Sequence, residues 1–163
     1  MLGAGQGTPL RSRIMAHAVA LILLVLALSF GAVACGEDST AEFKERYNDA
    51  VRPLSELGDD VVASLTNAGQ ASDLKLAREL EQYADRAARV RKNLSKLEPP
   101  EDTTDEFHEL LAALRRSVAD LRAVADSARE GDPAEADRAT KELVESGQRL
   151  RSAESDFRRA VED

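Results

Sequence analysis

Cysteine, histidine and tryptophan are nearly missing from this chain of 163 residues. It contains one cysteine, two histidines and no tryptophan, and only 4% of its residues are aromatic. A single cysteine excludes an internal disulfide, and so few cysteines and histidines exclude a zinc site or a cysteine–histidine nucleophile within one chain. His108 lies three residues after Asp105, but this pair departs from the Glu-x-x-His motif of di-iron bundles and has no second copy. We therefore predict no metal site and interpret His108 as a surface residue.

Motifs of common enzyme classes are missing as well. After residue 34 the chain has no G-x-S-x-G motif of serine hydrolases and no glycine-rich loop that could hold a phosphate. These absences predict a protein that is not an enzyme and that binds no cofactor.

Acidic residues outnumber basic ones. The chain has 22 lysines and arginines against 30 aspartates and glutamates, which gives a net charge of -8. An acidic surface repels the phosphates of nucleic acids and the headgroups of anionic lipids. We therefore expect no nucleic-acid partner and no attachment to a membrane through a basic patch.

The first 35 residues differ from the rest of the chain. Arg11 and Arg13 are the only charged residues before Glu37, and an apolar run from Ile14 to Phe30 follows them. A positively charged segment followed by an apolar one is the layout of a secretory signal peptide. The small residues Gly31-Ala32-Val33-Ala34 then lead to Cys35.

This segment resembles the lipobox of bacterial lipoproteins. In that family a small residue precedes a cysteine that is diacylated on its sulfur and becomes the new N-terminus. The resemblance implies a signal peptide at 1–34, a lipidated N-terminus with a short tether at 35–39, and membrane lipid as the partner of acylated Cys35. Two acyl chains hold a protein stably at a membrane, whereas one chain holds it only marginally. The location implied is the extracytoplasmic face of the cell membrane.

Two alternatives stay open for this segment. Ala32 stands where leucine is usual in the lipobox, and Ala32-Val33-Ala34 also fits the A-x-A site of ordinary signal peptidase. An uncleaved anchor is the second alternative, because Ile14 to Ala34 has about the 20 apolar residues that span a bilayer. The lone cysteine favours the lipoprotein, since an exported protein with an unpaired thiol is reactive and lipidation removes that thiol.

Beyond residue 40, apolar residues recur at steps of three and four, which predicts amphipathic helices. Ser72 and Asp132 suit helix N-caps, and Pro133 suits the first position of a helix. Thr103 with Glu106 predicts a capping box, and Gly131 predicts a helix end. The helices predicted by these patterns are 40–68, 72–97, 103–130 and 132–160.

Very short connections join these four segments, so consecutive helices should be antiparallel neighbours. The predicted fold is all-α, an up-down-up-down antiparallel four-helix bundle formed by one domain at 40–163. A helical array that completes its core with a partner is the alternative. The short tether predicts that the Pro99-Pro100 turn and the C-terminus lie at the same end of the bundle as Cys35.

The basic residues of the second helix could form a binding patch. We interpret them instead as a solvent face, because acidic and basic residues at helical spacing pair on helix surfaces. The basic residues are Arg86, Arg89, Arg91, Lys92 and Lys96. The pairs expected at this spacing are Asp85–Arg89, Glu42–Arg46, Asp137–Lys141, Glu145–Arg149 and Glu154–Arg158.

Three short segments extend the resemblance beyond the signal: Cys35-Gly36-Glu37-Asp38, Leu97-Glu98-Pro99-Pro100 and Gly131-Asp132-Pro133. With them the chain is similar to small bacterial lipoproteins of actinobacterial type that are rich in Ala, Arg and Asp. That resemblance implies a location and a helical bundle but no activity.

Two functions are therefore expected from the sequence. The first is a lipid-anchored cell-envelope bundle that acts as a non-catalytic protein-interaction or scaffold module with an envelope protein as partner. The second is a small-molecule or metal-binding envelope lipoprotein, with a pocket opened by a kink at Pro53 beside Tyr47 and Tyr83.

Overall fold

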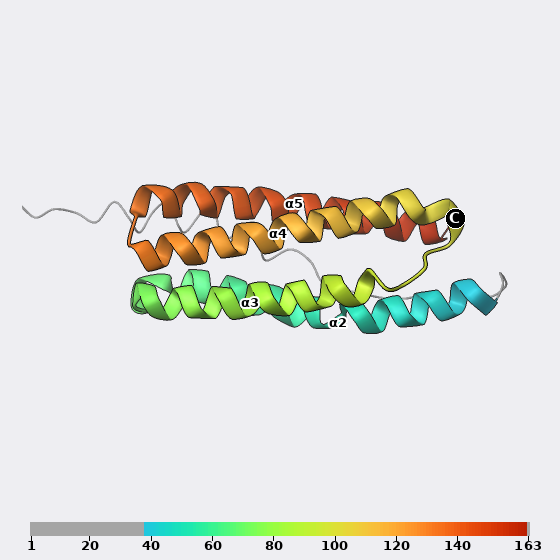
Figure 1. Cartoon of the computed structure of the whole chain (residues 1–163), viewed down its shortest axis with the longest axis horizontal. Coiled ribbons are helices and arrows are strands. Elements are labelled where there is room, and N and C mark those ends of the chain that lie inside the picture. The colour runs from blue at the N-terminus through green and yellow to red at the C-terminus, as the bar shows by residue number, and fades with distance from the viewer. Residues whose placement is uncertain (1–37, 163) are drawn as a thin grey trace, which may run out of the picture.

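The protein is a bundle of four long antiparallel helices (Figure 1). The computed structural model describes residues 38–162, and helices make up all the regular structure of that range. This confirms the predicted all-α, up-down-up-down bundle. The elements are α2 (Asp38–Thr66), η1 (Ala68–Gln70), α3 (Asp73–Leu94), η2 (Glu101–Thr103), α4 (Thr104–Glu130) and α5 (Pro133–Glu162).

Three helix ends are capped by the residues that the sequence predicts as caps. The Ser72 hydroxyl accepts a hydrogen bond from the Lys75 amide at 3.3 Å, which caps α3. One carboxylate oxygen of Asp132 accepts bonds from the second and third amides of α5 at 3.0 and 3.1 Å. Gly131 ends α4 with φ of 68°, in the left-handed region that a side chain disfavours.

The predicted capping box at the start of α4 is wrong. The Thr103 hydroxyl donates to the Pro100 carbonyl at 3.0 Å and accepts no cap bond from α4. The Thr103 amide bonds to the same carbonyl at 3.0 Å, which closes the tight turn of η2. The chain thus enters α4 through a 3-10 turn, because that turn satisfies a proline carbonyl that would otherwise lack a donor.

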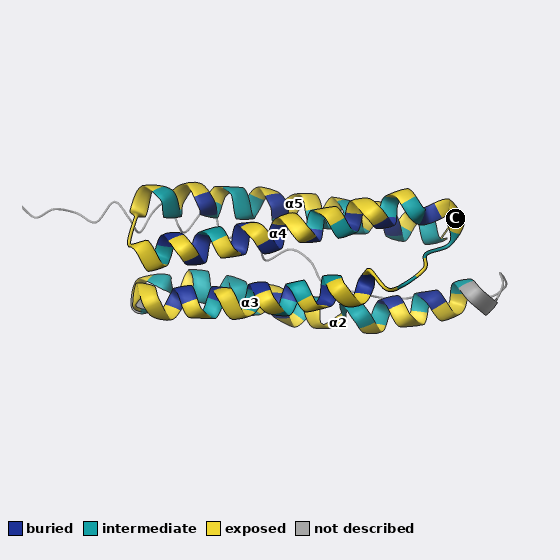
Figure 2. Ribbon diagram, viewed as in Figure 1, coloured by how far each residue is buried: buried dark blue, intermediate teal, exposed yellow. Residues whose placement is uncertain are grey.

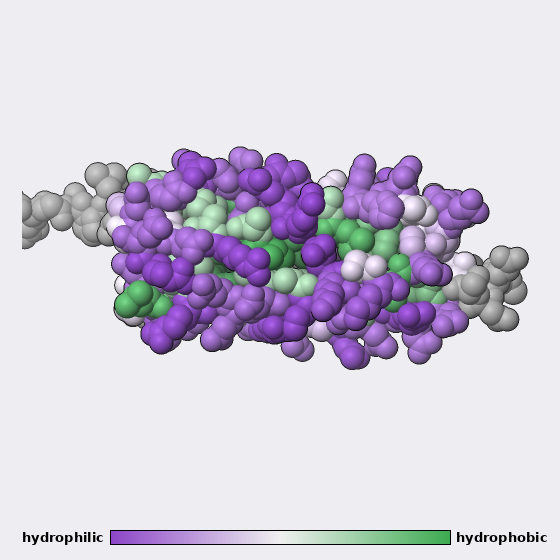
Figure 3. Space-filling model, in the orientation of Figure 1, coloured by the Kyte–Doolittle hydropathy of each residue, from purple (hydrophilic) through white to green (hydrophobic). Residues whose placement is uncertain are grey.

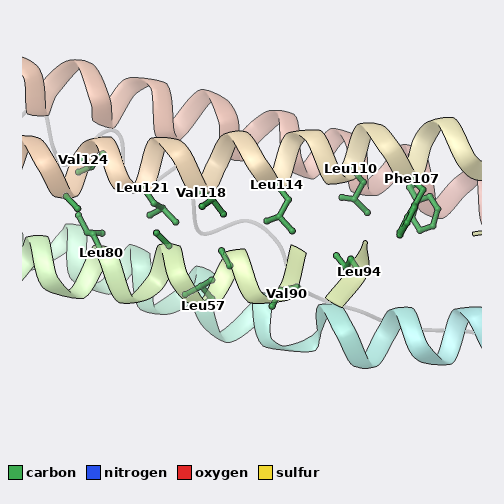
Figure 4. Packing of buried hydrophobic residues seen from close by; sticks show 14 of the residues in the cluster. Leu57, Leu80, Val90, Leu94, Phe107, Leu110, Leu114, Val118, Leu121 and Val124 are labelled. Atoms are coloured by element: carbon green, nitrogen blue, oxygen red, sulfur yellow. The ribbon is translucent and has the colours of Figure 1, made fainter. Parts of the chain in front are cut away.

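Helices α3 and α4 form the most buried half of the bundle. Leucines and valines of both helices interlock along most of their length (Figure 4). In α2 and α5 the exposed and half-buried residues dominate (Figure 2). The residues labelled along this ladder are Leu80, Val90 and Leu94 of α3 with Leu110, Leu114, Val118, Leu121 and Val124 of α4.

Four aromatic rings pack together at one end of the bundle. The ring centre of Tyr47 in α2 lies 5.1 Å from that of Phe157 in α5, and Phe107 in α4 lies 5.3 Å from Phe157. Phe43 joins them at 5.9 Å from Phe107. We call these four residues the aromatic cluster. The cluster joins α2, α4 and α5 at an end of the bundle where no loop connects these three helices to one another.

Removing one ring tests how much the aromatic cluster contributes to stability. Phe157 is 1% exposed and contacts the other three rings, so Phe157→Ala should lower the free energy of unfolding by about 3–5 kcal/mol. Urea denaturation followed by circular dichroism measures this change. Leu74→Ala is the control, because Leu74 is 59% exposed and its truncation should change the free energy by less than about 0.5 kcal/mol.

Gly131 offers a second test, of the turn between α4 and α5. Gly131→Ala should lower the free energy of unfolding by about 1 kcal/mol, because alanine is strained at a positive φ. Gly131→Asn should lower it less, since asparagine tolerates the left-handed conformation. Thermal unfolding of the two variants should therefore rank glycine above asparagine above alanine, and equal stability of all three would contradict the assigned turn.

Candidate functional site

The predicted lipidation site, Cys35, lies outside the described residues. Helix α2 begins at Asp38, two residues before the expected boundary, so only Gly36 and Glu37 separate it from Cys35. The α3–α4 connection and the C-terminal end of α5 lie at this same end of the bundle (Figure 1). The α3–α4 connection and the end of α5 therefore share an end of the bundle with the start of α2, and the aromatic cluster lies at that same end.

A small cleft opens between α2 and α5 at this end. Its volume of about 20 Å³ suits roughly one water molecule and is far below the 300–1,000 Å³ or so of a small-molecule site. It therefore offers no room for a substrate or an organic cofactor. The cleft is lined by Phe43, Lys44, Tyr47, Asn48, Phe157, Arg158, Val161 and Glu162.

Tyr47 is the one described residue of this cleft with a strongly shifted pKa. Burial of its phenol raises the pKa above the ordinary value near 10, and the nearby Glu154 carboxylate raises it further. The Arg158 guanidinium, 2.7 Å from Glu154, acts in the opposite direction. Tyr47 consequently stays neutral at physiological pH and supplies neither a base nor a nucleophile.

Tyr83 lies far from Tyr47. Its hydroxyl meets that of Ser64 at 3.0 Å on the seam between α2 and α3. Ser64 follows Tyr47 by 17 residues along α2, which is about 25 Å of helix. Pro53 is exposed and does not line the cleft. The structure thus brings Tyr47 together with the other rings and not with Tyr83.

Ion pairs join α3 to the helices on either side of it. Arg86 binds Asp60 of α2 at 2.6 Å, and Asp85 binds Arg122 of α4 at 3.1 Å. The predicted Asp85–Arg89 pair is wrong, because Asp85 reaches across to the neighbouring helix. The predicted Asp137–Lys141 pair is not among the ion pairs of the described residues. The pairs Glu42–Arg46, Glu145–Arg149 and Glu154–Arg158 are confirmed, at 3.8, 3.7 and 2.7 Å.

Within residues 38–162, acidic side chains pair with arginine and lysine side chains. No three acidic, histidine or cysteine side chains of this range gather into a metal site, and His108 is exposed. Ser72 and Lys75 have the S-x-x-K spacing of penicillin-binding proteins, but each of their side chains has another partner. The Ser72 hydroxyl caps α3, and the Lys75 ammonium lies 3.7 Å from Glu79.

The buried acid of α4 was missed from the sequence. Asp120 is 3% exposed and binds Arg116 at 3.0 Å, and Arg116 also binds Glu142 of α5 at 3.1 Å. The spacing contained two signals. Asp120 follows Leu114 by two steps of three residues, which places it on the buried stripe of α4. It also follows Arg116 by four residues, the spacing at which oppositely charged side chains pair on a helix.

The seam between α2 and α5 is the least closely packed of the bundle. Close backbone contacts join α2 to α3, α3 to α4 and α4 to α5. Ion pairs cross each of these three seams. Away from the aromatic cluster, no ion pair of the described residues joins α2 to α5. This open seam had no signal in the helix periodicity, because periodicity places residues on a face but does not say how closely two faces approach.

Comparison of the chain with protein-family models, with curated proteins and with solved structures finds no match. Within residues 38–162, no helix combines the length and the apolar character needed to cross a membrane.

The raised pKa of Tyr47 predicts a loss of stability in alkali. Above about pH 10 a tyrosine in the unfolded chain releases its proton, whereas folded Tyr47 keeps it. The free energy of unfolding should therefore be unaffected below pH 10 and fall above it, by up to about 1.4 kcal/mol per pH unit. Tyr47→Phe should remove this part of the fall. Tyr83→Phe is the matched control and should retain it, so an identical pH profile for wild type and Tyr47→Phe would contradict the assignment.

Proposed function

We propose that this protein is a lipid-anchored component of the bacterial cell envelope that acts without catalysis, as an interaction or scaffold module. The observation that carries the proposal is the N-terminal sequence, in which Arg11 and Arg13, an apolar run and small residues lead to the lone Cys35. This order of features is that of an exported protein that is processed and acylated at one cysteine. The lipid would be the only membrane attachment, since the chain is acidic.

The arrangement of the helices supports a tethered bundle. Two residues separate Cys35 from the start of α2, so the lipid would hold the end that contains the aromatic cluster close to the membrane. Helix α5 has 30 residues and is about 45 Å long. The η1 turn and the Gly131 turn would then stand at the far end of the bundle, accessible to other envelope proteins.

The described surface supports an interaction role more than a ligand-binding one. The cleft beside Tyr47 has a volume of about 20 Å³. A wider hollow of about 470 Å³ lies over α3 and α4, but its lining is charged and polar throughout and includes the ion pair of Asp85 with Arg122. A closed core with long helix faces offers area for a protein partner, whereas small-molecule sites require a formed concave pocket.

Replacement of Cys35 tests the anchor. We expect wild-type cells fed an alkyne fatty acid to yield a labelled protein in the membrane fraction, with a mass that shows cleavage after Ala34. Cys35→Ala should lose the label and the membrane location, because the acyl chains provide the attachment. Gly36→Ala, one residue further on, is the control and should keep both.

Two other results would contradict the proposal in different ways. An unlabelled wild type released after cleavage at Ala34 would show an ordinary secreted protein. A Cys35→Ala variant that keeps its N-terminus and stays in the membrane would show an uncleaved anchor. Cross-linking of both strains in the cell, followed by mass spectrometry, then tests the interaction role, which predicts an envelope partner that is captured only with the tethered form.

A further inference from the structure

A group of cations without ion pairs lies on the outer side of α3 and α4. Residues 86–97 contain five basic residues and no acidic one. Of these five, Arg86 is paired with Asp60, and the described structure shows no ion pair for the other four. Arg115 of α4 is likewise exposed and without an ion pair among the described residues. This is unexpected, because the chain has 30 acidic residues for 22 basic ones.

The seam between α3 and α4 sets the position of these cations. An ion pair joins Asp85 of α3 to Arg122 of α4 across it at 3.1 Å. Seven residues, or two helical turns, return a side chain to nearly the same face of a helix. Because the two helices are antiparallel, seven residues after Asp85 and seven residues before Arg122 the seam brings Lys92 opposite Arg115. The seam therefore holds two bases where, two turns away, it holds an acid and a base.

Arg89 and Lys96 extend this pair of bases into a patch. Arg89 lies three residues before Lys92 and Lys96 lies four residues after it, so the three exposed side chains share one side of α3 and of the turn that follows it. We call Arg89, Lys92, Lys96 and Arg115 the basic patch. No acidic residue lies within four positions of Lys92 or Arg115 along the chain. Within the described part of the chain, no ion pair joins the patch to the acidic residues of nearby segments, such as Glu56 of α2, Glu98 of the connection and Glu109 of α4.

Small side chains leave the basic patch accessible. Ala112 lies three residues before Arg115 and Ala119 four residues after it, and both alanines are exposed. On the same side of the bundle a narrow apolar strip runs between α3 and α4 (Figure 3). Because alanine ends at its Cβ atom, another segment can approach the helix backbone between the cations. The like charges of the patch repel one another, and bound carboxylates would remove this repulsion.

From this arrangement we infer that the basic patch binds an acidic segment of another envelope protein. The same seam shows that carboxylates suit its arginines, because Arg122 and Arg129 are each held by a carboxylate of α3. A carboxylate of the partner would take at Arg115 the place that Asp85 takes at Arg122. The inference rests on the proposed interaction role, for which it names the chemistry of the partner.

The position of the basic patch favours a protein over the membrane surface. The ion pair of Arg86 with Asp60 sets the register of α2 and α3 and places Lys96 level with Ala50, 12 residues after α2 begins at Asp38. That is roughly 18 Å from the tethered end, whereas the charge of a membrane surface is screened within about 8 Å at physiological salt. A bundle that stands on its lipid anchor therefore holds the patch out of reach of anionic headgroups.

Reversing one charge of the basic patch separates binding from folding. Arg115→Glu places a carboxylate opposite Lys92, as Asp85 lies opposite Arg122, so the melting temperature should stay the same or rise. The full chain in detergent should bind poly-L-glutamate, and added salt should weaken the binding. Arg115→Glu should lower the affinity about tenfold, because a carboxylate of the probe then meets repulsion where it met attraction.

Lys141→Glu is the matched control. Lys141 is exposed on α5 and has no ion pair among the described residues, so the substitution changes the net charge by the same amount away from the patch. This variant should bind poly-L-glutamate like the wild type. A wild type that does not bind, or a control that loses as much affinity as Arg115→Glu, would overturn the inference. A wild type that binds phosphatidylglycerol vesicles but not poly-L-glutamate would overturn it in favour of the membrane.

Cross-linking from within the basic patch identifies the class of partner in the cell. The photoreactive residue p-benzoylphenylalanine replaces Ala119 in the full chain or, as a control, Ala63, which is exposed on α2. We expect light to join position 119 to one envelope protein, through a peptide in which acidic residues outnumber basic ones. Arg115→Glu in the same chain should abolish this product. The inference is wrong if position 119 gives no product, a product with lipid alone or a peptide without excess acid, or if the product forms equally at position 63 or despite Arg115→Glu.

The basic patch and the lipid anchor fail separately. Fatty-acid labelling of Cys35 is measured in the same cells as the cross-linking. Normal labelling with no charge-dependent product from position 119 would remove the basic patch alone. Loss of labelling with an intact charge-dependent product would remove the lipid anchor alone.

Discussion

The contact of four aromatic rings at one end of the bundle is the interaction on which the arrangement of its first and last helices depends. Helices α2 and α5 are far apart in sequence and no connection joins them. Their tight contact is made by Phe43 and Tyr47 with Phe157, at ring distances of 6.1 and 5.1 Å. Phe107 fixes the same rings to α4. Aromatic residues bury a large area for each side chain, so a chain with few of them can still close one end of a bundle.

In the rest of the bundle, the helices are buried to different extents and are held by different contacts. Helices α3 and α4 share the ladder of leucines and valines seen in Figure 4. Helix α5 packs against α4 through small residues, including Ser117 and the fully buried Ser146. The distal half of α2 is held mainly to α3, by Asp60 with Arg86 and by Ser64 with Tyr83 and Glu79. Space-filling atoms show a mostly hydrophilic surface over α3 and α4, with a narrow apolar strip between them (Figure 3).

Helix number, order and most helix ends could be predicted because they depend on short-range patterns. Ser72, Gly131 and Asp132 act within a few residues of their position in the sequence, and so periodicity and capping chemistry locate them. Thr103 differs because its hydroxyl could bond either to the first amides of α4 or to the Pro100 carbonyl. The turn that follows Pro100 brings the hydroxyl to that carbonyl. Asp85 differs because its partner, Arg122, is 37 residues away. Partners across a seam depend on the register between helices, which spacing within one helix does not specify.

The same limit applied to the candidate site and explains what the structure adds to it. The sequence shows that Tyr47 is aromatic, but its position among the other rings depends on the register of three helices. The open α2–α5 seam likewise depends on how closely two helices approach, which no residue of either helix shows in the sequence alone. A lipid at Cys35 would pull on the start of α2, next to the aromatic cluster. The strongest contact between α2 and α5 would then lie next to the tether.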